Sequence, residues 1–347
     1  MPETLIDWAH AIAQPMVLWQ RSHGRHDLPW QGTRDPYRVW LSEIMLQQTQ
    51  VRTVLAYYPR FLERFPDVHA LAEASQDEVM SVWSGLGYYS RARNLYRCAQ
   101  VVVSQWGGVF PRRAAELETL PGIGRSTAAA IAAFCFDERA AILDGNVKRV
   151  LSRVLGFGED LSKSRHEQQL WTCAQQLLPQ SAADMPAYTQ ALMDLGATLC
   201  LPRRTHCQAC PVRSVCVAHA HNRTLDFPVK TRKLRRTTES LWLLLAQDSK
   251  DRVWLHKRPS RGIWAGLYCL PAFGNEADLR ASWPEGRWIR DLPVRIHALT
   301  HKDLHLHVAH YQGLKNSPPA GDGQWARVQE WETLGLPAPV RAVLTGG

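Results

Sequence analysis

The sequence predicts a multidomain protein in which an all-helical domain is followed by an α+β domain. Apolar residues recur at helical spacing from about residue 5 to residue 199. Four cysteines then lie close together between residues 200 and 216, and short β-type runs separated by Pro and Gly follow residue 238. The 347 residues suffice for two domains of ordinary size. We therefore expect a helical domain at 1–225, a basic linker at 226–237 and a second domain at 238–347.

Three segments of the first domain carry the clearest helix signals. Asp35 and Pro36 offer an N-cap and a proline at the first helical position, and apolar residues follow at i, i+3 and i+4 spacing as far as Met45. Residues 127–136 are nearly all small and apolar, which predicts a buried helix. Residues 147–155 repeat the amphipathic spacing, and Gly156 ends that helix.

The second domain has a different pattern. Residues 226–237 are polar and basic and include Pro228, which is typical of a linker. Short apolar or alternating runs at 241–245, 253–256 and 304–308 predict strands, and in the last of these the even-numbered residues share one face.

The net charge of +9 and the isoelectric point near 9.3 indicate a field that attracts polyanions, above all nucleic acid. One dense basic run lies at 230–236 and another at 91–97. No secretory signal pattern and no apolar stretch of membrane-spanning length is found in the sequence. We therefore expect a soluble, cytoplasmic monomer that meets DNA and no membrane.

Four cysteines, Cys200, Cys207, Cys210 and Cys216, follow the pattern C-x6-C-x2-C-x5-C. Four thiolates this close favour one metal centre over two disulfides in a reducing cell. A structural zinc site usually shows two short C-x2-C pairs, whereas this chain has one, so the spacing favours an iron–sulphur cluster without excluding zinc. A fully ligated centre of either kind is structural.

A glycine-containing turn precedes the buried helix. In Leu120-Pro121-Gly122-Ile123-Gly124, two glycines permit a tight turn whose backbone N–H groups point outward at a helix N-terminus. Such a turn binds phosphate, although an ordinary helix–helix connection explains the same residues.

Two carboxylates are candidates for acid–base chemistry. Glu43 lies about 130° from the centre of its helix's apolar stripe, so the pattern alone indicates a solvated glutamate. Asp144 directly precedes the helix at 147–155, where it can serve as a plain N-cap. Cleavage of a glycosidic bond, however, uses one protonated and one ionised carboxylic acid. The positive end of a helix stabilises an anionic Asp144. Enclosure of Glu43 beside a bound nucleobase would raise its pKa and keep it protonated.

The cysteine spacing, the turn at 120–124 and the segments 40–51, 85–94 and 144–147 resemble the endonuclease III and MutY superfamily of DNA glycosylases, and within it the adenine DNA glycosylases. The resemblance covers most of residues 5–220. It implies a helix-hairpin-helix at about 117–136 and a [4Fe-4S] cluster in a loop at 200–216. It also implies hydrolysis of the N-glycosidic bond of adenine mispaired with 8-oxoguanine or guanine in base excision repair.

The resemblance also implies roles for individual residues. Glu43 would protonate the adenine ring at N7, Asp144 would stabilise or transiently bond to the sugar's C1′, and Asn146 would orient it. Without the resemblance, Gln48 is a surface amide and Tyr88 a core aromatic. The residues implied to contact DNA or flip the base are Gln48, Thr49, Leu86, Tyr88, Gly122, Gly124 and Ser126.

Ser126 separates two kinds of glycosylase. Relatives that cut the strand carry a lysine at this position, because imine formation needs an amine. Serine cannot form the imine, so we expect a monofunctional enzyme that leaves an abasic site. The alternative enzyme is an endonuclease III-like glycosylase and abasic-site lyase for damaged pyrimidines, and the alternative class is a non-catalytic, metal-stabilised DNA-binding protein.

The second domain resembles the MutT-like (Nudix) domain of the same family from Gly262 to Pro271. It lacks the paired glutamates that bind magnesium in true Nudix hydrolases, so we expect recognition of the lesion and no hydrolysis. The family's Phe-Ser-His recognition loop reads Leu299-Thr300-His301 in this chain. The resemblance therefore assigns lesion recognition to Thr300 and His301, whereas Leu299 has no aromatic ring to offer.

Overall fold

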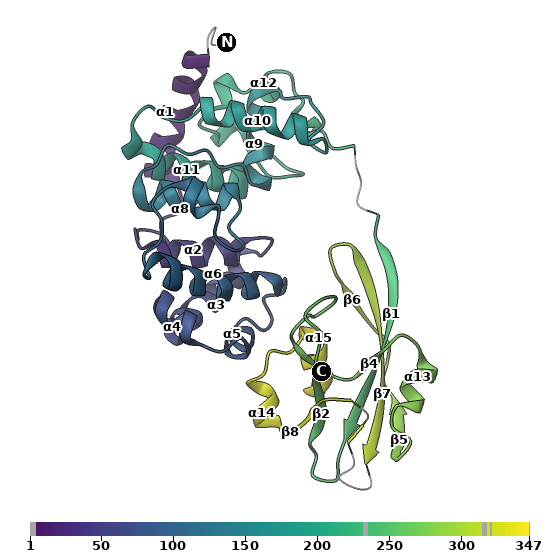
Figure 1. Cartoon of the computed structure of the whole chain (residues 1–347). Coiled ribbons are helices and arrows are strands. Elements are labelled where there is room, and N and C mark those ends of the chain that lie inside the picture. Colours follow the sequence, from purple (N-terminus) through teal and green to yellow (C-terminus); the bar gives the residue numbers. More distant parts are fainter. Residues whose placement is uncertain (1–4, 232–234, 314–317, 320, 347) are drawn as a thin grey trace. The chain divides into compact units, whose positions relative to one another are not determined.

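The computed structural model describes residues 5–231, 235–313, 318–319 and 321–346 (Figure 1). Contacts between Cα atoms divide the chain into two units, residues 1–69 with 97–233, and residues 70–96 with 234–347. The helical stretch 70–96 therefore groups with the C-terminal part of the chain. The expected strands near 241, 253 and 304 are present, and the regular elements described between residues 5 and 199 are helices, so the predicted fold class is confirmed.

The first unit is a bundle of helices whose apolar stripes face one another. Its helices that bear on the site are α1 Leu5–His23, α2 Pro36–Leu46, α3 Val51–Arg64, α7 Ala114–Leu117, α8 Arg125–Phe136, α9 Gly145–Leu155, α10 Ser164–Gln176, α11 Met185–Asp194 and α12 Val217–Ala220. α6 Ser90–Trp106 runs through both groupings. α8 is almost wholly buried, as its small apolar residues predict, and it contacts α2, α7 and α11.

Helix ends in this unit follow the predicted capping. Asp35 accepts a hydrogen bond from Tyr37 N at 2.9 Å, and Gly156 takes the left-handed conformation (φ 64°) that ends α9.

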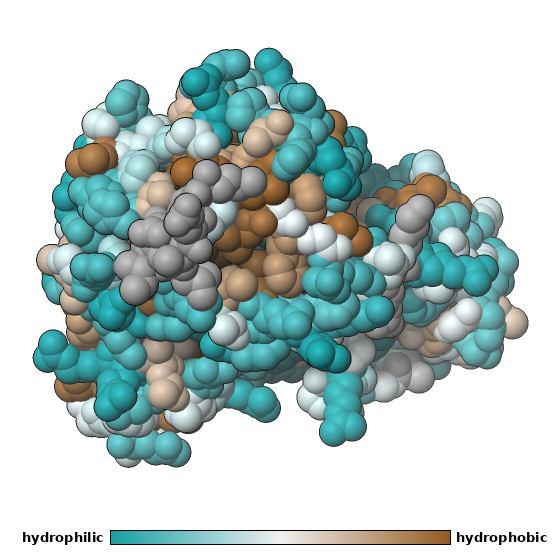
Figure 2. Space-filling view, turned by 90° about the horizontal axis from the view of Figure 1, so that it is seen from above, coloured by the Kyte–Doolittle hydropathy of each residue, from teal (hydrophilic) through white to brown (hydrophobic). Residues whose placement is uncertain are grey.

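Polar side chains cover most of the face seen in Figure 2, around a patch of apolar residues. No helix among the described residues is long and apolar enough to cross a membrane.

The second unit contains α4 Val68–Glu73 in part, α5 Gln76–Val82 and a mixed sheet. The strands are β1 Thr237–Gln247, β2 Val253–Lys257, β3 Tyr268–Cys269, β4 Ala272–Phe273, β5 Gly286–Asp291, β6 Arg295–Ala298, β7 Lys302–Gly313 and β8 Gln324–Ala326. The main path runs β3-β2-β1-β7-β5, and β1 and β7 pair in parallel from Thr237↔Lys302 to Gln247↔Gln312 (Figure 1).

Alternation places Leu304, Leu306 and Val308 on one buried face of β7. α13 Glu276–Ala281 contributes Leu279 to a buried hydrophobic cluster that also contains Leu244 and Trp283. The remaining helices are α14 Val328–Glu332 and α15 Ala338–Leu344.

The first residues of the expected linker at 226–237 are hydrogen-bonded to the helical unit. Leu161 N donates to Val229 O at 3.0 Å, and the buried carboxylate of Asp160 accepts from the backbone N of Thr231 at 3.2 Å. β1 already begins at Thr237. Residues 232–234, which carry part of the basic run, lie outside the described residues.

Candidate active site

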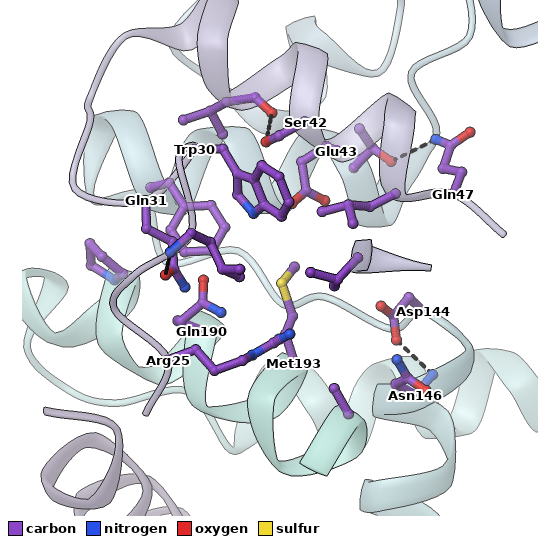
Figure 3. A pocket seen from close by; sticks show the side chains of 18 of the residues that line it. Arg25, Trp30, Gln31, Ser42, Glu43, Gln47, Asp144, Asn146, Gln190 and Met193 are labelled. Atoms are coloured by element: carbon purple, nitrogen blue, oxygen red, sulfur yellow. Dashed lines mark hydrogen bonds between the residues drawn. The ribbon is translucent and has the colours of Figure 1, made fainter. Parts of the chain in front are cut away.

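Asp144 is held at the N-terminus of α9 by the helix it caps. Its Oδ1 accepts the backbone N–H groups of Asn146 and Val147, both at 2.8 Å. The second carboxylate oxygen faces a cavity that α2, α8, α9 and α11 line together (Figure 3). Asp144 can therefore cap α9 and face the cavity at once, because each uses a different oxygen of the same carboxylate.

Glu43 projects from α2 into the same cavity and is half-buried. Burial raises the pKa of Glu43 to about 8, and the negative charge of Asp144 adds to the rise. The helix pattern alone indicated a solvated glutamate. The pattern gave the wrong environment because the face of α2 opposite the core lines a cavity formed with α8, α9 and α11.

The cavity has a volume of about 1070 Å³. Figure 3 shows Glu43 and Trp30 entering it from one side and Gln190 and Met193 of α11 from the other. Several lining side chains were not predicted from the sequence, namely Arg25, Leu28, Trp30, Gln31, Gln190 and Met193. Residues 24–34 have no helical or strand periodicity, so no pattern marked them.

The wall of the cavity combines a flat apolar surface with polar edges. Trp30 is 8% exposed and its ring meets Tyr58 edge-on at 5.5 Å between centroids. Gln31 Oε1 accepts from Leu28 N at 3.3 Å, whereas its buried Nε2 has no hydrogen-bond partner within the part of the chain that the structure describes. An unpaired buried donor is unfavourable in a filled protein interior, and Gln31 is one of the residues that line this cavity.

The glycine turn lies between α7 and α8. Gly122 has φ 78°, which favours glycine, and Gly124 is the N-cap of α8; both are exposed. Ser126, in the first turn of α8, lines the cavity, and its Oγ accepts from Leu143 N at 3.0 Å. The turn is thus tied to the residue that precedes Asp144.

Gln48 and Thr49 follow the end of α2 and line the same cavity. Gln48 is exposed and has φ 55°, a conformation that L side chains seldom adopt. Backbone strain of this kind persists where the surroundings impose it and is common at functional sites. The structure therefore brings Glu43, Gln48, Thr49, Ser126, Asp144 and Asn146 together around one cavity.

Tyr88 and Thr300 lie together in the second unit. Their hydroxyl groups share a hydrogen bond of 2.9 Å, so two residues far apart in the sequence form one feature. Tyr88 is 44% exposed and has φ 48°, a left-handed conformation that Gln48 also adopts in the first unit. Leu86, in contrast, is only 6% exposed, and its expected contact with DNA stays a prediction. His301 follows Thr300 and is exposed, and its carbonyl accepts from Thr237 N at 3.1 Å.

The four clustered cysteines line a single cavity beside α9. Arg153 donates from Nη1 to Cys200 Sγ at 3.2 Å and to Leu201 O at 2.8 Å, and it is 1% exposed. Burial raises the pKa of the Cys210 thiol to about 12. Within the described ranges, no group of three or more His, Cys, Asp or Glu side chains is close enough to bind one metal ion.

Arg149, one helical turn before Arg153, connects this cysteine loop with Asn146. Its Nη2 donates to Asn146 Oδ1 at 2.9 Å and to Gly196 O at 2.7 Å, and its Nε donates to Cys200 O at 2.8 Å. Burial lowers the pKa of Arg149. α9 therefore carries Asp144 at one end and holds the cysteine loop through two buried arginines.

Comparisons with known proteins find relatives for both parts of the chain. Residues 41–176 match the family "HhH-GPD superfamily base excision DNA repair protein", and residues 241–346 match the family "NUDIX domain". An adenine DNA glycosylase of Buchnera aphidicola subsp. Baizongia pistaciae (strain Bp) is 35% identical over 339 residues, covering 96% of this chain and 95% of that protein. An adenine DNA glycosylase of Homo sapiens is 48% identical over 218 residues, covering 60% of this chain and 39% of that protein.

Among solved structures, a thermostable thymine-DNA glycosylase is similar with a TM-score of 0.54 at 27% identity. The match covers 62% of this chain and 97% of that structure.

Proposed function

The chain belongs to the adenine DNA glycosylase family, and from this premise we propose that it hydrolyses the N-glycosidic bond of adenine mispaired with 8-oxoguanine or guanine in double-stranded DNA. It acts as a monofunctional glycosylase of base excision repair and leaves an abasic site. The observation that carries the proposal is the pair Glu43 and Asp144 in one cavity large enough for a flipped base.

Glu43 supplies the proton. With a pKa of about 8 it keeps its proton at neutral pH, and it lies in the wall against which an extruded adenine would rest. Protonation at N7 makes the base a better leaving group and weakens its bond to the sugar. Asp144 offers its second oxygen to the positive charge that develops at C1′, while the N–H groups of α9 hold the first oxygen in place. Asn146 helps to orient the sugar.

The cavity also supports the choice of base. Trp30 provides a flat surface for stacking, and the unpaired Nε2 of Gln31 offers a donor to a ring nitrogen. Gln190 contributes a second amide on the opposite wall. Apolar surfaces with a few directed polar groups are typical of sites that bind one small planar ligand.

Grip on the DNA is shared between the two units. The exposed backbone at Gly122 and Gly124 suits a phosphate at the N-terminus of α8. Gln48 and Tyr88 are exposed residues in strained conformations, as expected of side chains inserted into the base stack. Thr300 and His301 recognise 8-oxoguanine, and the hydrogen bond between Thr300 and Tyr88 supports a joint reading of the lesion.

The donor set in the cysteine loop fits a [4Fe-4S] cluster. The four thiols line one cavity. Their spacing, with a single short C-x2-C pair, supports the cluster over a zinc site. Cys200, Cys207, Cys210 and Cys216 would hold it, and when bound it would stabilise the loop that Arg149 and Arg153 attach to α9.

The proposal is tested by base release from defined duplexes. We expect the protein to free adenine opposite 8-oxoguanine and opposite guanine and to leave the strand intact until alkali is added. An endonuclease III-like lyase would instead release damaged pyrimidines and give a stoichiometric borohydride-trapped adduct. Ser126 argues against the lyase, since its hydroxyl cannot form an imine and already accepts the Leu143 N–H.

A further inference from the structure

A buried carboxylate lies directly behind the wall of the cavity. Asp194, the last residue of α11, has none of its surface exposed. Its Oδ1 accepts from Gln190 Nε2 at 2.8 Å and from Arg25 Nε at 2.7 Å, and its Oδ2 accepts from Arg25 N at 3.0 Å. Gln190 and Arg25 both line the cavity, whereas Asp194 does not.

The charge of Asp194 is sustained by Arg25. The ion pair has an N–O distance of 2.7 Å, and the Asp194 side chain is 1% exposed. A buried carboxylate is strongly unfavourable unless it is paired and hydrogen-bonded, and Asp194 is both. Its oxygens accept from N–H groups of Arg25 and Gln190, and a carboxylate paired with a guanidinium accepts hydrogen bonds without donating any.

This polarity determines how the neighbouring amide is turned. Gln190 must present its NH₂ group to Asp194, because its carbonyl oxygen would be repelled there. Oε1 of Gln190 is then left to face the cavity (Figure 3). We propose that Asp194 is a positioning residue for base specificity, which orients Gln190 so that its oxygen accepts a hydrogen bond from the exocyclic amino group of a 6-aminopurine. The inference rests on the proposed function.

The second amide of the cavity has the opposite polarity. Gln31 uses Oε1 on Leu28 N and leaves Nε2 as an unpaired donor. Adenine offers an amino donor beside a ring-nitrogen acceptor, which complements an acceptor from Gln190 and a donor from Gln31. Hypoxanthine, the 6-oxo analogue, offers an oxygen at C6 and an N–H at N1, so on this edge it mismatches both amides. Sites built on such hydrogen bonds reject analogues that leave buried polar groups unpaired.

The test compares adenine with hypoxanthine in the same duplex, opposite the same partner base, under single-turnover conditions. In Asp194→Asn, the new amide can accept from or donate to Gln190, so the Gln190 amide is no longer held in one orientation. We expect the ratio of adenine to hypoxanthine release to fall by about tenfold or more. Thr198→Val is the matched control, because Thr198 Oγ1 donates to the backbone carbonyl of Asp194 and leaves the carboxylate untouched. It should keep the wild-type ratio.

A second variant keeps the inference testable if Asp194→Asn proves unstable on melting. Gln190→Met removes the amide and fills a similar volume, so it should lower the same ratio by itself. In the Gln190→Met background, Asp194→Asn should change the ratio no further. An unchanged ratio in Gln190→Met, or an equal effect of Asp194→Asn with and without Gln190, contradicts the inference.

Failure of the proposed function and failure of the role of Asp194 give different results. A wild-type protein that releases adenine from no duplex overturns the proposed function. A wild type that releases adenine and rejects hypoxanthine, with variants that leave the ratio unchanged, overturns the role of Asp194 alone. The pH profile is a further readout, because Asp194→Asn should leave the alkaline limb set by Glu43 in place.

Discussion

The protonation of Glu43 has a measurable consequence for activity. Its pKa rises from an ordinary 4.5 to about 8, chiefly through burial. At pH 7 about nine tenths of the molecules then carry the catalytic proton, against less than about one in a hundred for an ordinary glutamate. We expect the single-turnover rate of adenine release to show its alkaline limb near pH 8 and to fall about tenfold for each further unit.

The matched variant is Glu43→Gln, which keeps the size of the side chain and removes the transferable proton. General acid catalysis commonly contributes about 10²- to 10⁴-fold, so the rate should fall by that factor and lose its alkaline limb. Release of adenine would be followed in a defined duplex with enzyme in excess over DNA. An alkaline limb near pH 5 in wild type, or an undiminished rate in Glu43→Gln, would refute the role of Glu43.

The same shift has a consequence for stability. The folded protein binds the Glu43 proton more tightly than the unfolded chain, so the residue destabilises the fold increasingly as pH rises from about 4.5 to about 8. At pH 7 the cost is at most about 3.5 kcal/mol, from roughly 2.5 pH units at about 1.4 kcal/mol each. Glu43→Gln should therefore unfold at a higher denaturant concentration than wild type at pH 8, with little difference near pH 4.5. No difference at pH 8 would show that Glu43 is not desolvated.

Asp144, Ser126, the cysteine loop and Thr300 each provide a further test. Asp144→Asn should keep the stability of α9, since asparagine also caps helices, yet lose adenine release; a matching loss of stability would reduce Asp144 to a cap. Wild type, with Ser126, should give no stoichiometric adduct with DNA under borohydride. Purified protein should be brown with absorbance near 400 nm, whereas a colourless zinc protein would exclude the cluster. Thr300→Val should lower the preference for 8-oxoguanine over guanine opposite adenine. An unchanged preference would show that the hydrogen bond between Thr300 and Tyr88 plays no part in recognising the lesion.

Much of the architecture was predictable because its signals are local. Capping at Asp35, the small apolar residues of α8 and the alternation along β7 each depend on a few neighbouring residues. The pairing of β1 with β7 was not predictable, since about sixty residues separate the two strands and neither pattern specifies its partner. The grouping of residues 70–96 with the C-terminal part of the chain depends equally on long-range contacts.

The candidate site divides in the same way. Asp144 carries a visible cap signal, so its place at a helix N-terminus followed from the sequence. The environment of Glu43 did not, because helical periodicity separates the core face from the opposite face without distinguishing solvent from a cavity. Gln190 and Asp194 lie on an ordinary helix, and only the tertiary structure shows the contact with Arg25 that gives Asp194 its role. Leu86 is the reverse case, a motif residue whose side chain is buried.

The central claim is that Glu43 and Asp144 together break the bond between adenine and its sugar. The most direct test measures adenine release from a duplex with adenine opposite 8-oxoguanine, by wild type, Glu43→Gln and Asp144→Asn at pH 7. We predict release by wild type and a loss of about a hundredfold or more in each variant. Undiminished release by both variants would contradict the claim.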